Sequence, residues 1–104
     1  MALKLTDLMV LLVEPSATQQ KIICNYLNNL GIHQIYTVLS GQETLIQMED
    51  YEPDLVISTL YLPDMTGTDL VHKMRENERF NDTAFMLASS ETRFRYLDPI
   101  RQAG

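Results

Sequence analysis

Cysteine, long apolar runs and basic charge are all scarce in this chain. Its 104 residues include one cysteine, Cys24, so an internal disulfide is excluded, a reducing compartment is expected, and a packed thiol is the simplest interpretation. No apolar run approaches the roughly 20 residues that a membrane-spanning helix needs, and the start Met1–Lys4 lacks the long apolar stretch of a secretion signal. These absences predict a cytoplasmic protein that does not act at a membrane.

The charge of the chain is acidic. Fourteen acidic residues against eight basic ones give a formal net charge of -6. A general nucleic-acid surface needs clustered Lys and Arg to displace counterions from phosphates, so nucleic acid is not an expected partner. Arg93, Arg95 and Arg101 form a local basic patch near the C-terminus, which we interpret as a solvated face.

Strand and helix patterns alternate along the chain, with short connections between them. Apolar runs rich in β-branched residues predict strands over residues 8–13, 35–38, 54–59 and 85–88. Capping residues predict helices that begin after Ser16, after Ser40 and at Thr68-Asp69, the first of them over residues 17–29, and Asp98-Pro99 predicts a further helix start. Such alternation specifies a parallel sheet with right-handed crossovers, and therefore one small α/β domain over residues 1–104.

Apolar residues at helical spacing predict which helix faces pack on this sheet. The first helix carries Ile23, Tyr26, Leu27 and Leu30, widened by Ile22; the second carries Leu45, Ile46 and Met48; the third carries Leu70, Val71 and Met74. The first expected strand is apolar on both faces, as a central strand covered on each side by helices must be.

The stretch 54–67 carries the most specific pattern. It reads Asp-Leu-Val-Ile-Ser-Thr-Leu-Tyr-Leu-Pro-Asp-Met-Thr-Gly, and it resembles, nearly residue for residue, the third strand and following loop of the receiver (CheY-like) domain of two-component response regulators. The other matching segments are Val10–Val13 followed by an acidic residue, Leu30-Gly31, Ser40-Gly41, Pro53–Val56, Phe85–Glu91 and Ile100–Gly104. The resemblance implies a flavodoxin-like, doubly wound parallel sheet of strand order 2-1-3-4. The family's fifth strand and last helix are expected to be missing, as in a receiver that is incomplete at its C-terminus.

The resemblance also implies a phosphorylation site that has lost its chemistry. In the family, two acidic residues after the first strand and an aspartate after the third hold a magnesium ion, and that aspartate accepts the phosphoryl group. Here the acidic pair falls on Glu14 and Pro15, the acceptor on Thr59 and the switch hydroxyl on Ser89, while the family's lysine would lie beyond Gly104. A threonine hydroxyl is a much weaker nucleophile than a carboxylate and brings no charge to a cation. We therefore expect degenerate site positions, with no catalytic residue, metal or cofactor.

Two functions from different classes fit these residues. The favoured one is a pseudo-receiver in two-component signal transduction, which is not an enzyme and binds a protein partner without phosphorylation: a histidine kinase, another receiver or an output domain. The alternative is a phosphorylation-competent receiver with a displaced acceptor, Asp64 or Thr59, together with Glu14. However, the resemblance implies that Asp64 is a turn residue that points to solvent, and an Asp after a Pro is ordinary turn chemistry. A small flavodoxin-like ligand binder is a third reading, although no Gly-rich phosphate loop follows the first strand.

The expected absence of a fifth strand and a last helix has a consequence for association. The fourth strand would be left unpaired, and the first helix would be uncovered around Ile22 and Tyr26. We therefore expect a homodimer through the fourth strand and the first helix.

Overall fold

The computed structural model describes residues 4–89 and 93–97, and for residues 89 and 93–97 it describes the backbone alone. In chain order the elements are the 3-10 helix η1 (Leu5–Asp7), β1 (Met9–Val13), α1 (Ala17–Asn29), β2 (Gln34–Val38), α2 (Gly41–Asp50), β3 (Leu55–Thr59), α3 (Gly67–Arg75), the 3-10 helix η2 (Glu78–Phe80), β4 (Ala84–Ser89) and β5 (Arg93–Leu97). The predicted helix start at Asp98-Pro99 lies outside the described residues. None of the described helices is long and apolar enough to cross a bilayer.

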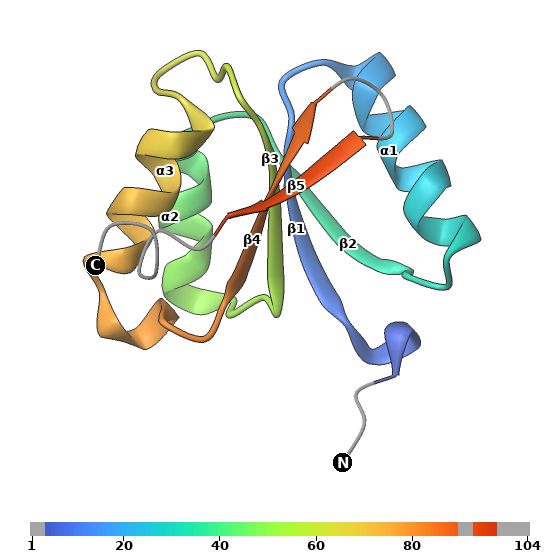
Figure 1. Ribbon diagram of the computed structural model, residues 1–104, viewed down its shortest axis with the longest axis horizontal. Helices are drawn as coiled ribbons and strands as arrows, with labels where there is room; N and C mark the ends of the chain where they lie inside the picture. Colours follow the sequence, from blue (N-terminus) through green and yellow to red (C-terminus); the bar gives the residue numbers. More distant parts are fainter. Residues whose placement is uncertain (1–3, 90–92, 98–104) are drawn as a thin grey trace.

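The strands form one sheet in the order β2-β1-β3-β4-β5. The first four run parallel, so that Val10 lies opposite Ile35 on one side and Leu55 on the other, and Val56 lies opposite Phe85. Helices α2 and α3 cover one face of the sheet, and α1 covers the other (Figure 1). The predicted parallel order 2-1-3-4 and the doubly wound α/β architecture are confirmed.

Two apolar clusters lie on the two faces of the sheet. Between the sheet and the pair α2 and α3, the cluster contains Leu11, Val13, Val38, Met48, Val56, Leu70, Val71, Met74, Phe80, Phe85 and Leu87. Between the sheet and α1, it contains Val10, Leu12, Ile23, Leu27, Ile32, Ile57 and Ala88. Strands β1 and β3 contribute alternate residues to both clusters, because successive side chains of a strand point to opposite faces.

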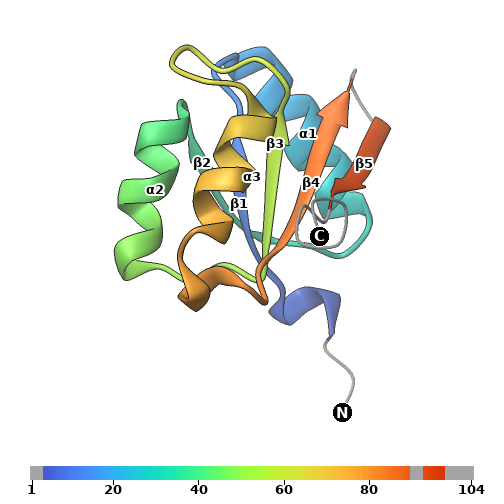
Figure 2. The ribbon, with the colours of Figure 1, turned by 60° about the vertical axis from the view of Figure 1, so that its left-hand side comes forward.

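The expectation that the fourth strand is left unpaired is wrong. Strand β5 runs antiparallel beside β4, with Phe85 opposite Leu97 and Ser89 opposite Arg93, as Figure 2 shows from the side. This strand covers the edge through which we expected a homodimer to form, so the same chain satisfies the outward backbone groups of β4. The alternation of Arg93, Phe94, Arg95 and Tyr96 is a strand signal that we interpreted only as a basic patch.

Side-chain caps start the three α-helices. The hydroxyl of Ser16 accepts the N–H of Gln19 at the start of α1, which covers the predicted residues 17–29. Helix α3 begins one residue earlier than predicted, because Thr66 and Asp69 form a reciprocal capping box around Gly67. These caps fix the points at which the chain turns from strand into helix.

The predicted inward face of α2 is wrong at Ile46. Its side chain is 54% exposed, whereas Met48 is fully buried and Leu45 packs partly against the same cluster. The position that we overlooked is Thr44, which is fully buried, with its hydroxyl donating to the Ser40 carbonyl at 2.8 Å. Because this bond satisfies the hydroxyl, a threonine can take an inward position one turn before Met48.

One face of α1 borders β3 and β4 in the part of the chain that the structure describes. A groove of about 260 Å³ runs there, lined by Tyr26, Leu27, Leu30, Ile32, Leu55, Ile57 and Met86. Tyr26 lines the groove, whereas Ile22 is half-buried and does not. Of the described helices, α1 alone lies on this face of the sheet (Figure 1).

Candidate functional site

The candidate site lies where β1, β3 and β4 end. Because these strands run parallel, their carboxyl ends meet at one edge of the sheet, and Val13, Ser58 and Leu87 stand in register there. Open α/β sheets place their ligands at this edge. The predicted site positions that follow these strands are therefore brought together by the topology.

Glu14 holds the turn that follows β1. Its side chain is only 8% exposed, and one carboxylate oxygen, Oε2, accepts the N–H of Ser16 at 2.9 Å. Its own N–H donates to the Val38 carbonyl at 3.0 Å, and its carbonyl accepts from Nε2 of Gln20 at 2.7 Å. The carboxylate thus satisfies the backbone of its own turn, while the adjacent Pro15 is exposed and offers no side-chain donor or acceptor.

Thr59 ends β3 and is half-buried. Its carbonyl accepts the hydroxyl of Ser58 at 2.8 Å, and Ser58 is fully buried. The start of α3 packs tightly against this point, since a Cβ built on Gly67 would lie 2.7 Å from the Thr59 carbonyl oxygen. Only a glycine fits there without displacing the backbone, so Gly67 sets how closely α3 approaches the end of β3.

The family resemblance leads us to expect a solvent-facing turn residue at Asp64, and the structure shows in addition that backbone N–H groups hold its side chain. Although its side chain is exposed, its Oδ1 accepts the N–H of Gly41 at 2.9 Å and its Oδ2 accepts the N–H of Gln42 at 2.8 Å. These two backbone N–H groups, that of Gln42 foremost, lower the pKa of the Asp64 carboxyl below its usual 3.8. The next residue, Met65, lies directly against Gly41. The loop between β3 and α3 is therefore anchored on the first turn of α2.

The residues at this edge do not match a magnesium site of the kind that the resemblance implies. The site that the resemblance implies combines three carboxylates with water, because magnesium prefers hard oxygen ligands in octahedral geometry. Of the predicted positions, Glu14 alone supplies a carboxylate, and that carboxylate already binds the N–H of Ser16. Within residues 4–89 and 93–97, no three His, Cys, Asp or Glu side chains are grouped so that they could hold a metal ion.

The structure places the four predicted site positions as follows. Glu14 and Pro15 follow β1, Thr59 ends β3, and the backbone of Ser89 ends β4, while the Ser89 side chain lies outside the described part of the chain. The sequence did not indicate the anchoring N–H groups of Gly41 and Gln42, because their partner lies more than 20 residues along the chain. The one local clue is the helix start at Ser40-Gly41, because the first N–H groups of a helix have no acceptor within the helix.

Comparison with known proteins identifies the family to which this sequence is similar. A family model described as the response regulator receiver domain matches residues 10–104. The chemotaxis protein CheY1 of Helicobacter pylori is 29% identical over 83 residues, which cover 79% of this chain and 67% of that protein. The luminescence regulatory protein LuxO of Vibrio campbellii is 34% identical over 77 residues, which cover 74% of this chain but 17% of that protein.

Solved structures show the same fold. The signal receiver domain of a signal transduction histidine kinase from Syntrophus aciditrophicus superimposes with a TM-score of 0.74 and 27% identity, over 79% of this chain and 61% of that one. These known proteins include a short chemotaxis protein, a long regulator and a receiver domain of a kinase. The fold is therefore common to chains of very different length and output.

Proposed function

The chain belongs to the response regulator receiver domain family, and we propose that it is a pseudo-receiver that signals by binding protein partners without accepting a phosphoryl group. The observation that carries the proposal is the residue at the end of β3. Thr59 stands where the family resemblance puts the acceptor aspartate, and Pro15 stands in place of one of the acidic pair. A neutral hydroxyl without a general base is a poor nucleophile, so the edge lacks both the attacking group and the cation anchor of phosphoryl transfer.

The geometry also argues against the displaced acceptor. Both carboxylate oxygens of Asp64 accept backbone N–H groups at the start of α2. These two N–H groups stabilise the carboxylate charge and lower its pKa, so each oxygen is a weaker nucleophile than in a carboxylate without such bonds. Oε2 of Glu14 accepts the N–H of Ser16, so a backbone N–H group also orients this carboxylate.

Intact-mass spectrometry tests the proposal. The chain is incubated with magnesium and acetyl phosphate, alongside an aspartate-bearing receiver that shows the phosphodonor to be active. We expect no mass gain in this chain, and beryllofluoride with magnesium should leave its amide spectrum unchanged. The gain of one phosphoryl group would refute the proposal, and Asp64→Asn and Thr59→Val variants would then locate the acceptor.

We further propose that the partners include a second copy of this chain, bound through the groove beside α1 rather than through β4. From Ala17 to Asn29 the only charged residue is Lys21, so two copies of an acidic chain can bring these faces together without apposing carboxylates. Leu30 is 49% exposed at the rim of the groove and can enter the groove of the other copy. Such an arrangement is isologous, as in most homodimers.

Sedimentation velocity tests this homodimer. Leu30→Glu places a charge at the groove and should shift the chain to monomer. Leu39→Glu is the matched control, because Leu39 is 50% exposed and does not line the groove, so this variant should sediment like the wild type. A wild-type chain that remains monomeric at high concentration, or an equal effect of the two variants, would contradict the second-copy proposal and leave the pseudo-receiver proposal intact.

A further inference from the structure

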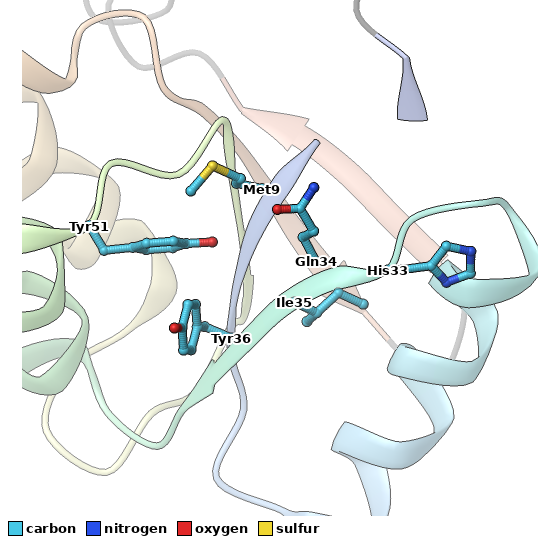
Figure 3. A pocket seen from close by; sticks show the side chains of 6 residues that line it. All are labelled: Met9, His33, Gln34, Ile35, Tyr36 and Tyr51. Atoms are coloured by element: carbon cyan, nitrogen blue, oxygen red, sulfur yellow. The ribbon is translucent and has the colours of Figure 1, made fainter. Parts of the chain in front are cut away.

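A hollow lined by two tyrosines lies at the opposite end of the sheet from the candidate site. It measures about 440 Å³ and is lined by Met9, His33, Gln34, Ile35, Tyr36 and Tyr51 (Figure 3). Met9 and Gln34 are register partners at the first positions of β1 and β2, so the hollow lies where these strands begin. We call this hollow the tyrosine notch.

The two tyrosine rings of the notch meet edge to face. Their centroids are 4.7 Å apart and their planes are inclined by 78°, with Tyr36 on β2 and Tyr51 directly after α2 (Figure 3). The Tyr36 side chain is 55% exposed, and Tyr51 is half-buried. The face of an exposed tyrosine ring attracts a Lys or Arg side chain that lies within about 6 Å of its centroid.

Strand β2 has a free edge beside the notch. In the described part of the chain it pairs with β1 alone. Its sequence Gln34–Val38 contains no charged residue and no proline, the residues by which proteins usually protect an edge. The Val38 carbonyl faces β1, since it accepts the N–H of Glu14 at 3.0 Å. By the two-residue repeat of a strand, the backbone groups of Ile35 and Thr37 face outward and are open to an added strand.

The chain next to the notch is strongly acidic. Four of the six residues from Glu49 to Asp54 are carboxylates, and all four are exposed. Glu52 binds Arg79, and one oxygen of Asp54 accepts the N–H of Met9 at 2.8 Å. Asp54 lies near enough to Tyr51 to help raise the pKa of its phenol, after the larger effect of burial and that of Tyr36. An incoming segment therefore meets negative charge beside the aromatic rings.

We propose that the tyrosine notch and the free edge of β2 bind an extended, basic segment of a partner protein. The segment adds as a strand to β2, pairing with the backbone of Ile35 and Thr37, and places a Lys or Arg side chain on the ring of Tyr36. A second copy of this chain is disfavoured here, because it would bring its own net charge of -6 toward the carboxylates at 49–54. The inference deepens the proposed function and rests on it for the class of partner.

Peptide titration followed by amide chemical shifts tests this inference without a phosphodonor, so it can fail separately from the proposed function. The probe is a short synthetic peptide of alternating valine and arginine. We expect shifts confined to β2, Tyr51 and the start of β1. Replacing arginine by glutamate should weaken binding by about tenfold or more, because the acidic segment then repels the probe. Methylating alternate backbone nitrogens should abolish the shifts, because strand pairing needs these N–H groups.

Two variants separate the edge from the ring. Thr37→Pro removes an outward N–H and leaves the hydrogen bonds between β1 and β2 intact. This variant should weaken binding of the arginine peptide by about fivefold. Tyr36→Thr keeps the strand propensity and removes the aromatic ring. This variant should weaken binding of the arginine peptide by about threefold. The matched control is Tyr61→Thr, because Tyr61 is an exposed tyrosine that does not line the notch.

The titration also defines what overturns the inference. The inference is overturned if the arginine and glutamate peptides bind equally, or if the main shifts lie outside β2, Tyr51 and the start of β1. An equal loss of binding in the Tyr36 and Tyr61 variants would also overturn it. The N-methylated peptide keeps the test decisive if the proline variant fails to fold.

Discussion

Replacing Gly67 with alanine tests whether the end of β3 is held against the start of α3. A Cβ on Gly67 would lie 2.7 Å from the carbonyl oxygen of Thr59 and 2.7 Å from Cδ2 of Leu87, whereas ordinary contacts begin at 3.4 Å. The Thr59 oxygen is held by the hydroxyl of Ser58, and the N–H of Gly67 donates to the Leu60 carbonyl at 2.7 Å. Backbone, rather than a flexible side chain, therefore has to move.

The expected loss of stability follows from these contacts. Overpacking of a tight site costs about 1–3 kcal/mol, and the better helix propensity of alanine offsets at most about 1 kcal/mol of this. We expect Gly67→Ala to lower the free energy of unfolding by about 1–2 kcal/mol and the Tm by roughly 4–8 °C for each kcal/mol.

Gly41→Ala is the matched control. Gly41 is the first residue of α2, as Gly67 is of α3, so the propensity gain is similar. The three atoms nearest to a Cβ on Gly41 all belong to the side chain of Met65, which can swing aside. We therefore expect this variant to lose less than about 1 kcal/mol.

Urea unfolding followed by far-UV circular dichroism measures both variants, with the m-value as a check that the extent of unfolding is unchanged. A Gly67→Ala variant that is as stable as the wild type would refute the close packing of α3 on the end of β3. So would a larger loss in Gly41→Ala than in Gly67→Ala.

Three further predictions concern other parts of the fold. Met48→Ala should lower the free energy of unfolding in urea by about 2–5 kcal/mol, because the Met48 side chain is buried. Ile46→Ala should lower it by less than about 1 kcal/mol, because Ile46 is exposed. Equal losses in the two variants would contradict the conclusion that Met48 faces the sheet and Ile46 faces away from it. Folding lowers the pKa of Asp64, so its ionised form stabilises the fold above pH 3.8 and this contribution is lost as the pH falls. Asp64→Asn should thus lose stability at neutral pH, and its stability should fall less than that of the wild type from about pH 5 to about pH 2; parallel curves would contradict this. Burial raises the pKa of Cys24, so a thiol reagent at mildly alkaline pH should react more slowly with the folded chain than with the urea-unfolded chain, and equal rates would show an accessible thiolate.

Much of the fold could be predicted because it is encoded in short segments. The cap at Ser16 and the apolar residues that follow it fixed α1 over Ala17–Asn29, and the apolar run before Glu14 fixed β1. Local capping and periodicity need no knowledge of the rest of the chain. The same holds for the position of Thr59, which the pattern around β3 placed at the end of that strand.

The errors fall where packing against the sheet, or a neighbouring strand, decides what a local pattern leaves open. Leu45 and Ile46 are adjacent apolar residues on α2, and only the packed helix shows which one turns inward. Thr44 took a core position because its hydroxyl bonds back to the Ser40 carbonyl, and its polarity hid this role. Strand β5 was overlooked because the family pattern was followed rather than the alternation of Arg93–Leu97.

By itself, the sequence determined most of the strand and helix segments and the small α/β class, and its family resemblance added the parallel order of the first four strands and the position of Thr59 at the end of β3. Only the tertiary structure decided that Asp64 anchors its loop on α2, that β5 covers β4, and that Tyr36 and Tyr51 share a notch beside a free edge. The physical reason is that propensity and periodicity act over a few residues. Hydrogen bonds and ring contacts between distant segments are formed only when the sheet brings those segments together.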